Sequence, residues 1–162
     1  MLRDAIVVKL GELETLEEAN PLSSISGQTP LGVFDAIELD STVVGVSREL
    51  FANGHYEQAI FEAYKLVDNE VKSKAGIPEL DGRALMAHVF SEERPLLRLN
   101  ALASRSDRDE QEGFKLIFMG AMQGIRNPKA HDHVAGTSAS RALKYLALAS
   151  LLIERAGEAQ AP

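Results

Sequence analysis

Arginine and histidine stand close together in one short segment, Gly124-Ile125-Arg126-Asn127-Pro128-Lys129-Ala130-His131. Arg126 keeps its positive charge at physiological pH, whereas a histidine such as His131 titrates near neutrality. A fixed cation beside a group that gives or takes a proton is suited to handling a phosphate. Because Arg and His occur at this spacing by chance in many chains, the elements around the pair must decide whether the two side chains meet.

A long helix is expected to lead into this segment. Asp107-Arg108-Asp109-Glu110 resembles a capping box, in which an acceptor at the N-cap is followed three residues later by Glu. Apolar residues then follow at helical spacing: Phe114, Ile117, Phe118, Ala121, Met122 and Ile125. Pro128 cannot continue the helix and disfavours helical geometry at Asn127. Arg126 should therefore occupy the last turn, where its charge suits the carbonyl end of the helix dipole.

Glycines interrupt the same helix pattern. Each costs about 1 kcal/mol relative to Ala inside a helix, so a compensating reason is expected for Gly113, Gly120 and Gly124. Close approach of another helix is the favoured explanation, and room for a ligand against the backbone is the alternative.

The remaining patterns predict an all-α fold, an antiparallel bundle of four to five main helices with a short helical insertion. Residues 1–34 are expected to hold an N-terminal helix and a linker, and residues 35–158 the bundle. Ile6-Val7-Val8 leaves a strand open as an alternative within the first helix. The other segments are helices over Leu2–Ala19, Asp40–Phe51, Tyr56–Lys74, Arg83–Phe90 and Ser138–Arg155, with a linker over Asn20–Gly32. The last helix is apolar on more than one side, which suggests a subunit interface in addition to the core.

Composition limits the possible functions. The 162 residues suit one domain, and the absence of cysteine excludes disulfides and thiolate chemistry and fits the cytoplasm. No apolar run is long enough for a signal peptide or a membrane span, so no membrane association is expected. The net charge of −7 argues against a general nucleic-acid coat protein, yet residues 113–150 hold five Lys or Arg and one Asp, a local charge of +4. A polyanion is tolerated in that region, although solvated helix faces explain the same charges equally well.

Three blocks of sequence carry a family resemblance. They are Phe51-Ala52-Asn53-Gly54-His55-Tyr56-Glu57-Gln58-Ala59, then Asp81-Gly82-Arg83-Ala84-Leu85-Met86, then Phe118-Met119-Gly120 through His131. The chain resembles the Ymh-type, abortive-infection-like branch of the HEPN superfamily from about Asp40 to Ile153. The resemblance implies a helical bundle that forms a homodimer. It also implies a metal-independent endoribonuclease, with RNA as substrate, in host defence or a toxin–antitoxin system. An antitoxin or another defence protein is then a possible partner. Superfamily members without activity leave open a non-catalytic dimer that binds nucleotide or RNA or scaffolds a partner.

Carried over residue by residue, the resemblance assigns catalysis to Arg126 and His131, with Asn127 as their polar companion. Without it, Arg126 and His131 would be read as groups that satisfy the end of a helix, and Asn127 as a residue suited to a proline turn. Lys129 and Arg141 are candidates for binding substrate, with solvated surface residues as the alternative. His131 and His133 lack a clear third ligand, so neither a metal nor another cofactor is expected.

Overall fold

The computed structural model describes residues 29–127 and 136–162. The chain divides between Ile37 and Glu38 into two units. The described part of the first unit holds α2 (Pro30–Ala36), which Thr29 caps by accepting a hydrogen bond of 3.2 Å from the Gly32 amide. The predicted linker is therefore wrong over its last residues, because Thr at the N-cap and Pro at the first position start a helix. The predicted helix over residues 2–19 lies outside the described residues.

The described residues of the second unit are helical, apart from loops and one isolated β-bridge between Arg98 and Gln160. The prediction of an all-α fold is confirmed. None of these helices combines the length and the apolar character that crossing a membrane requires. The elements of the second unit are α3 (Ser41–Ala52), α4 (Tyr56–Ala75), α5 (Gly82–Val89), α6 (Arg105–Ala121), the π-helical segment η1 (Met122–Arg126) and α8 (Ala139–Glu158).

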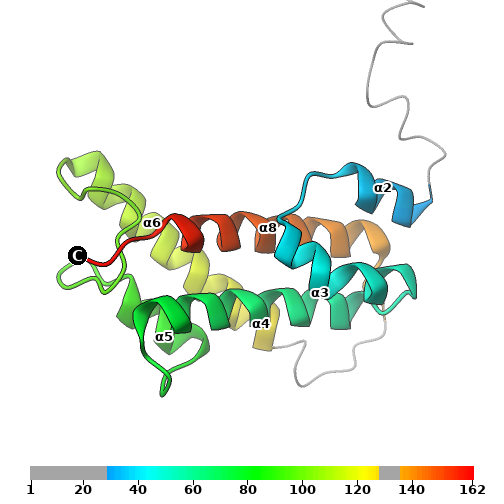
Figure 1. The fold of residues 1–162 in the computed structure, drawn as a ribbon, viewed down its shortest axis with the longest axis horizontal. Helices are drawn as coiled ribbons and strands as arrows, with labels where there is room; N and C mark the ends of the chain where they lie inside the picture. Colours follow the sequence, from blue (N-terminus) through cyan, green and yellow to red (C-terminus); the bar gives the residue numbers. More distant parts are fainter. Residues whose placement is uncertain (1–28, 128–135) are drawn as a thin grey trace, which may run out of the picture. The chain divides into compact units, whose positions relative to one another are not determined.

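Helices α4 and α8 lie side by side in the second unit, and α3 packs against both (Figure 1). A tight turn in which Gly54 adopts φ +78° reverses the chain between α3 and α4, so these two helices run antiparallel as predicted. Helices α4 and α8 run parallel instead. Tyr64 Oη donates a hydrogen bond of 3.0 Å to the Tyr145 carbonyl. Lys74 Nζ donates one to the Gly157 carbonyl, near the C-terminal ends of both helices. The bundle is therefore not antiparallel throughout.

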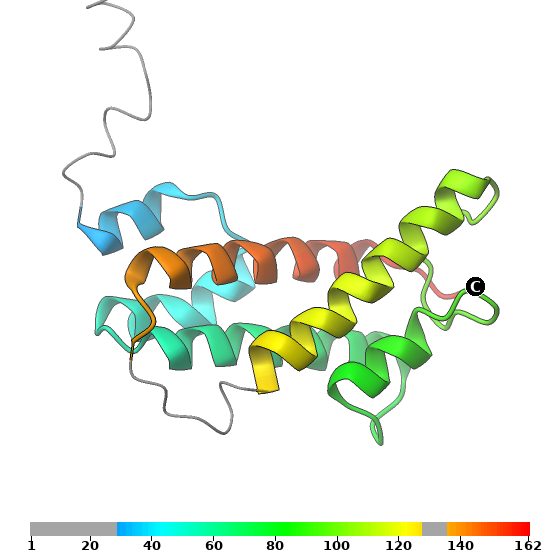
Figure 2. The ribbon, with the colours of Figure 1, turned by 180° about the vertical axis from the view of Figure 1, so that it is seen from behind.

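Helices α4 and α8 can run parallel because α6, which lies between them in the sequence, carries the chain back along the bundle. It begins beside the end of α8, where Arg155 Nη2 lies 2.6 Å from Glu110 Oε1, and it runs obliquely towards α4 (Figure 2). Ser104 caps it, accepting a hydrogen bond of 3.1 Å from the Asp107 amide, while the Asp107 carboxylate bonds back to the Ser104 amide. The capping box predicted at Asp107 and Glu110 is wrong by one turn, because serine three residues earlier already satisfies the first amides.

A buried glutamine holds the segment between α5 and α6 in place. The Gln111 side chain accepts a hydrogen bond from the Leu99 amide at 2.9 Å and donates one to the Leu97 carbonyl at 3.0 Å. Arg98, between these two residues, pairs its backbone with Gln160 on its other side. The insertion is therefore ordered, as predicted, and Leu97 is buried.

The core matches most of the predicted apolar faces. The predicted face of α4 is fully buried, and so are Leu85, Met86 and Phe90 of the insertion: the α4 residues are Ala59, Ile60, Ala63, Tyr64, Val67 and Val71. Ile117 was expected in the core but is 43% exposed. A Cβ at Gly113, Gly120 or Gly124 would meet nothing within 4 Å among the described residues, so the expected close helix contact at these glycines is wrong for that part of the chain. Gly120 and Gly124 are exposed.

Candidate functional site

Arg126 ends the π-helical segment η1, and this segment determines which way its side chain points. Each residue of an α-helix turns about 100° around the axis, so Ile125, seven positions after Phe118, would share its buried face. A π turn bonds residue i to residue i+5 and is wider, so each residue turns less. Ile125 is only half-buried, and the Arg126 guanidinium reaches inward to α4. Because of the π turn, Arg126 rather than the predicted Ile125 lies on the inner side of the helix.

The partner of Arg126 is Asp68, a carboxylate within the apolar face of α4. Nη2 of Arg126 lies 3.6 Å from Oδ2 of Asp68, whose side chain is 2% exposed. The same Oδ2 lies 4.0 Å from Nζ of Lys72, one turn further along α4. A carboxylate so deeply buried requires partners of this kind. The predicted placement of Arg126 against its own helix carbonyls is thus replaced by an ion pair between η1 and α4.

Gly82 at the start of α5 completes this cluster. Its amide donates a hydrogen bond of 2.7 Å to Oδ1 of Asp68, whereas the neighbouring Asp81, at the N-cap position, makes no side-chain bond to the helix. Asp68 thus caps α5 from another helix. Gly82 adopts φ +54°, and a Cβ there would lie 3.5 Å from Nη1 of Arg126. Glycine suits the position through its backbone conformation, and the contact shows how closely the guanidinium fits over it.

The cluster leaves Arg126 with unused hydrogen-bonding capacity. A guanidinium has five N–H donors, and Nε of Arg126 is buried with no acceptor among the described residues. The side chain is 21% exposed, and that of Lys72 is 27% exposed. Two cations against one carboxylate leave a net positive charge at the junction of α4, α5 and η1. The exposed part of such a guanidinium can donate to a phosphate oxygen.

The other predicted site residues are not gathered around Arg126 in the described part of the chain. Asn127 follows it directly and is exposed, with helical φ −63° and ψ −46°. The predicted loss of helical geometry at Asn127 is wrong, since the effect of a following proline is a bias that helices ending in a proline kink can overcome. Lys129 and His131 lie outside the described residues. Arg141 is exposed in the first turn of α8.

Arg141 lies away from the Asp68 cluster along the bundle axis. Tyr64 of α4 is level with Tyr145 of α8, so Arg141 is one turn nearer the start of both helices, and Asp68 is one turn nearer their ends. The eight-residue difference corresponds to about 12 Å along the axis. A substrate that contacts both Arg126 and Arg141 would therefore have to extend across more than one nucleotide.

The local positive charge predicted for residues 113–150 is partly neutralised. Lys115 pairs with Glu112, and its Nζ lies 3.5 Å from Oε1 of Glu92. Burial lowers the pKa of Lys115, but the hydrogen bond and charge of Glu112 together with Glu92 outweigh burial and raise it. The hydrogen bond from Lys115 in turn lowers the pKa of Glu112. Because Arg126 is also paired, the exposed cations Arg141 and Lys144 contribute most of the remaining charge in the described part of this region.

Asp68 is the site residue that sequence reasoning missed. The signal was available, because a lone carboxylate stands in an otherwise apolar face of α4, beside Val67 and one turn before Val71. Such a residue requires a buried cation or amide as a partner, but the pattern alone does not say which.

Two further features of the described residues bear on ligand binding. A hollow of about 300 Å³ lies at the start of α4 and is lined by residues 54–58 with Gly136 and Thr137. It does not include the Asp68 cluster. No three His, Cys, Asp or Glu side chains within residues 29–127 and 136–162 are grouped closely enough to hold a metal ion.

Comparison with known proteins gives a family. Searches of the curated proteins and of the solved structures each gave no match. The model of a family described as "Protein of unknown function (Hypoth_ymh)" matches residues 37–155, which include α3 to η1, most of α8, and the cluster of Asp68, Lys72, Gly82 and Arg126. Because this match covers well over half of the chain, the protein belongs to the Hypoth_ymh family.

Proposed function

We propose that the protein is a metal-independent endoribonuclease of the HEPN type, which acts in the cytoplasm in host defence or a toxin–antitoxin system. The observation that carries the proposal is the fixed guanidinium of Arg126. It is held 3.6 Å from a buried carboxylate, yet part of its side chain faces solvent and its Nε has no acceptor among the described residues. The resemblance of the segment from Arg126 to His131 to the HEPN motif supports the same proposal.

The proposed chemistry is attack of the RNA 2′-hydroxyl on the adjacent phosphorus. His131 takes the proton of that hydroxyl or gives one to the leaving 5′-oxygen, a contribution of about 10²–10⁴-fold for a well-placed acid or base. Arg126 stabilises the negative charge that builds up on the phosphoryl oxygens. Asn127 is the polar companion, and Lys129 and Arg141 bind flanking phosphates. The products carry 2′,3′-cyclic phosphate and 5′-hydroxyl ends.

A homodimer belongs to the proposal, with Arg126 and His131 of both copies lining one cleft, so that one histidine acts as base and the other as acid. An antitoxin or another defence protein would restrain the activity. Mixing wild type with an excess of His131→Ala chains tests the shared cleft. Cleavage per wild-type chain should fall if each cleft needs both histidines, whereas independent sites would keep the same rate per wild-type chain.

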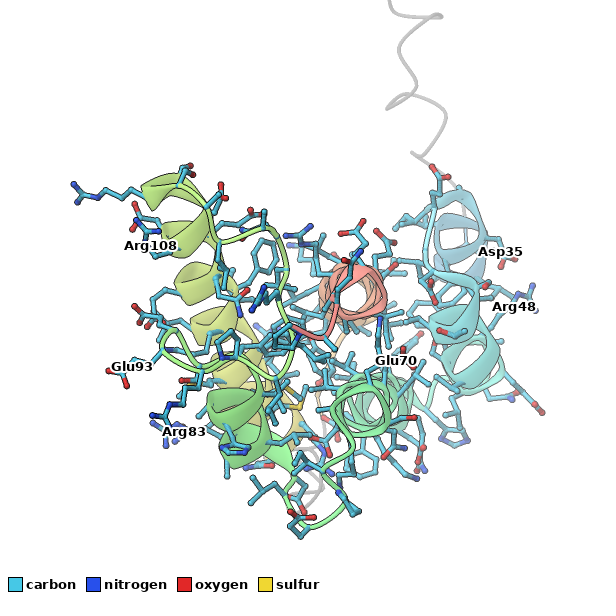
Figure 3. The ribbon with its side chains drawn as sticks, turned by 60° about the vertical axis from the view of Figure 1, so that its left-hand side comes forward. Asp35, Arg48, Glu70, Arg83, Glu93 and Arg108 are labelled. Carbon is cyan, nitrogen blue, oxygen red and sulfur yellow. The ribbon has the colours of Figure 1, made fainter. Side chains whose placement is uncertain are left out.

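The decisive experiment is cleavage of a labelled single-stranded RNA by the full chain in EDTA. Wild type should cleave and leave cyclic phosphate ends. Arg126→Ala and His131→Ala should each lose at least 100-fold in rate, and Arg83→Ala should remain active because Arg83 points outward from α5 (Figure 3). Intact RNA at micromolar wild-type protein, or a His131→Ala variant as active as wild type, would refute the proposal.

The ion pair also favours a second candidate, a non-catalytic helical protein that binds nucleotide or RNA or scaffolds a partner. Asp68 neutralises Arg126 and uses it to join η1 to α4, which is a sufficient structural reason for an arginine at this position. This candidate predicts RNA binding without cleavage and no toxicity on expression. Expression of wild type beside Arg126→Ala distinguishes the two, since toxicity that depends on Arg126 is expected only from the nuclease.

A further inference from the structure

The solvent side of α8 carries a regular line of residues spaced alternately by four and three positions. This spacing keeps residues on one side of a helix. All members are exposed, and we refer to them as the α8 seam: Ser140, Lys144, Ala147, Leu151, Glu154 and Glu158. The seam is apolar in the middle, basic near its start and acidic near its end. Leu151 is 44% exposed, which is high for a leucine at the centre of a long helix.

The seam faces away from the rest of the second unit. The buried residues of α8 alternate with it around the helix and include Leu146, Ala149 and Ile153. Figure 3 looks nearly along α8 and shows α4 below it, with α3 and α6 to its two sides. No described element of the second unit covers the seam.

The seam is complementary to itself when a second α8 lies against it in the opposite direction. In that arrangement Lys144 faces Glu154 of the second copy, Ala147 faces Leu151, and Ser140 faces Glu158. The midpoint of each of these pairs falls at the level of Ala149. One two-fold axis therefore brings opposite charges together at both ends and sets a large apolar side chain against a small one at the centre. A parallel arrangement would place like charges together.

We infer that the α8 seam is a contact between two copies of this chain, paired antiparallel around a two-fold axis at Ala149. Two-fold pairs are the commonest assemblies of soluble proteins, and they require a surface that complements itself in this way. Among the described residues, the two seam carboxylates have local partners. Glu154 accepts a hydrogen bond of 3.2 Å from Ser150, and an oxygen of Glu158 lies 2.7 Å from Nη1 of Arg155. Both glutamates are nevertheless exposed and able to face a partner.

The strength of the contact follows from its composition. Two exposed apolar residues per copy bury little surface, so the dimer is expected to be weak, with a dissociation constant on the order of micromolar. The paired charges lie at the surface and are screened by salt, with a Debye length of about 10 Å at 0.1 M and 3 Å at 1 M. The dimer should therefore dissociate as salt is raised.

This inference does not rest on the proposed nuclease. Asp68 and Arg126 meet on α4, on the side of α8 opposite the seam. Pairing through α8 consequently does not bring two Arg126 side chains together, and the shared cleft of the proposed nuclease requires a separate contact. The α8 contact is therefore measured as the loss of mass on charge reversal in the seam, which the cleft contact does not affect.

The test is the mass of the full chain in solution by sedimentation velocity at about 50 µM in low salt. Wild type is expected at no less than twice the 17.6 kDa of one chain. Lys144→Glu and Glu154→Lys should each be lighter than wild type, by half if α8 makes the only contact, because each places two like-charged pairs in the contact. A mixture of the two variants should recover the wild-type mass, since both pairs are then opposite in charge, and so should the double variant. Arg83→Glu, the same charge change on α5, should keep the wild-type mass.

Recovery in the mixture also shows that both variants fold, because misfolded chains would not pair. Three results would overturn the inference: a monomeric wild type, a wild-type mass that Lys144→Glu leaves unchanged, or variants that do not regain that mass when mixed. The second result would assign the dimer to another face, and the third would exclude the antiparallel register.

Discussion

Removing the carboxylate of Asp68 is the most informative single change in this protein. In Asp68→Ala the Gly82 amide, now bonded at 2.7 Å, loses its acceptor in the interior, which costs about 1–3 kcal/mol. Arg126 also loses its counter-charge. Breaking a buried ion pair costs about 3–5 kcal/mol, but the Arg126 side chain is 21% exposed and can recover part of that from water. A total loss of about 2–4 kcal/mol in the free energy of unfolding is expected.

Two further variants separate the parts of this loss. Asp68→Asn keeps an acceptor for Gly82 and removes only the charge, so about half of the loss is expected. Combining Asp68→Ala with Arg126→Ala in a double-mutant cycle isolates the ion pair, and a coupling energy above about 1 kcal/mol is expected because the two groups are in contact. Urea unfolding followed by circular dichroism gives each free energy.

The control variant removes an aspartate carboxylate that is exposed to solvent. Asp109 lies 3.8 Å from Arg105 on α6, and both side chains are largely exposed, so Asp109→Ala should change stability by less than about 0.5 kcal/mol. If Asp68→Ala were as mild as Asp109→Ala and its effect added independently to that of Arg126→Ala, Asp68 would not be the anchor of the arginine.

Three other changes test separate parts of the structure. Gly82→Ala should cost about 1–2 kcal/mol in unfolding free energy, because an L-residue is strained at φ +54°. Gln111→Leu should cost about 2–3 kcal/mol in urea unfolding, since it leaves two buried backbone groups of the insertion without partners. Asp40 caps α3; burial raises its pKa, but hydrogen bonds from Thr42 and the next amide outweigh burial and lower it. The ionised Asp40 therefore contributes to the free energy of unfolding above its unfolded pKa of about 3.9, and this contribution is lost as pH falls through the lower folded pKa. Asp40→Asn should consequently flatten the acid side of a plot of unfolding free energy against pH.

Much of the fold could be predicted from local sequence patterns. The face of α4 and the ends of α3 and α4 at Asn53 and Gly76 depend on residues close together in the chain, and the structure confirms them. The parallel order of α4 and α8 could not be predicted in this way. It depends on where α6 places the start of α8, and helix periodicity does not contain that information.

The candidate site also divides into features that local sequence predicts and features that depend on packing. The pattern singled out Arg126, but it did not give the direction of the Arg126 side chain, because a π turn cannot be told from an α turn by apolar spacing. The error at Ile125 and the wrong partner for Arg126 have this one cause. Asp68 belongs to another helix, and only the packing of η1 against α4 makes it the partner. Gly113, Gly120 and Gly124 were likewise assigned a neighbouring helix that the described residues do not supply.

Because Asp68 serves both α5 and Arg126, loss of activity alone cannot establish a catalytic role for the arginine. Arg126→Ala removes a cation from a buried carboxylate, so it is expected to lower stability and any cleavage together. Arg126→Lys keeps the charge but not the planar set of donors that binds two phosphoryl oxygens. A catalytic guanidinium predicts that Arg126→Lys loses cleavage while unfolding changes little. A structural guanidinium predicts that cleavage, measured well below the unfolding transition, follows only the folded fraction.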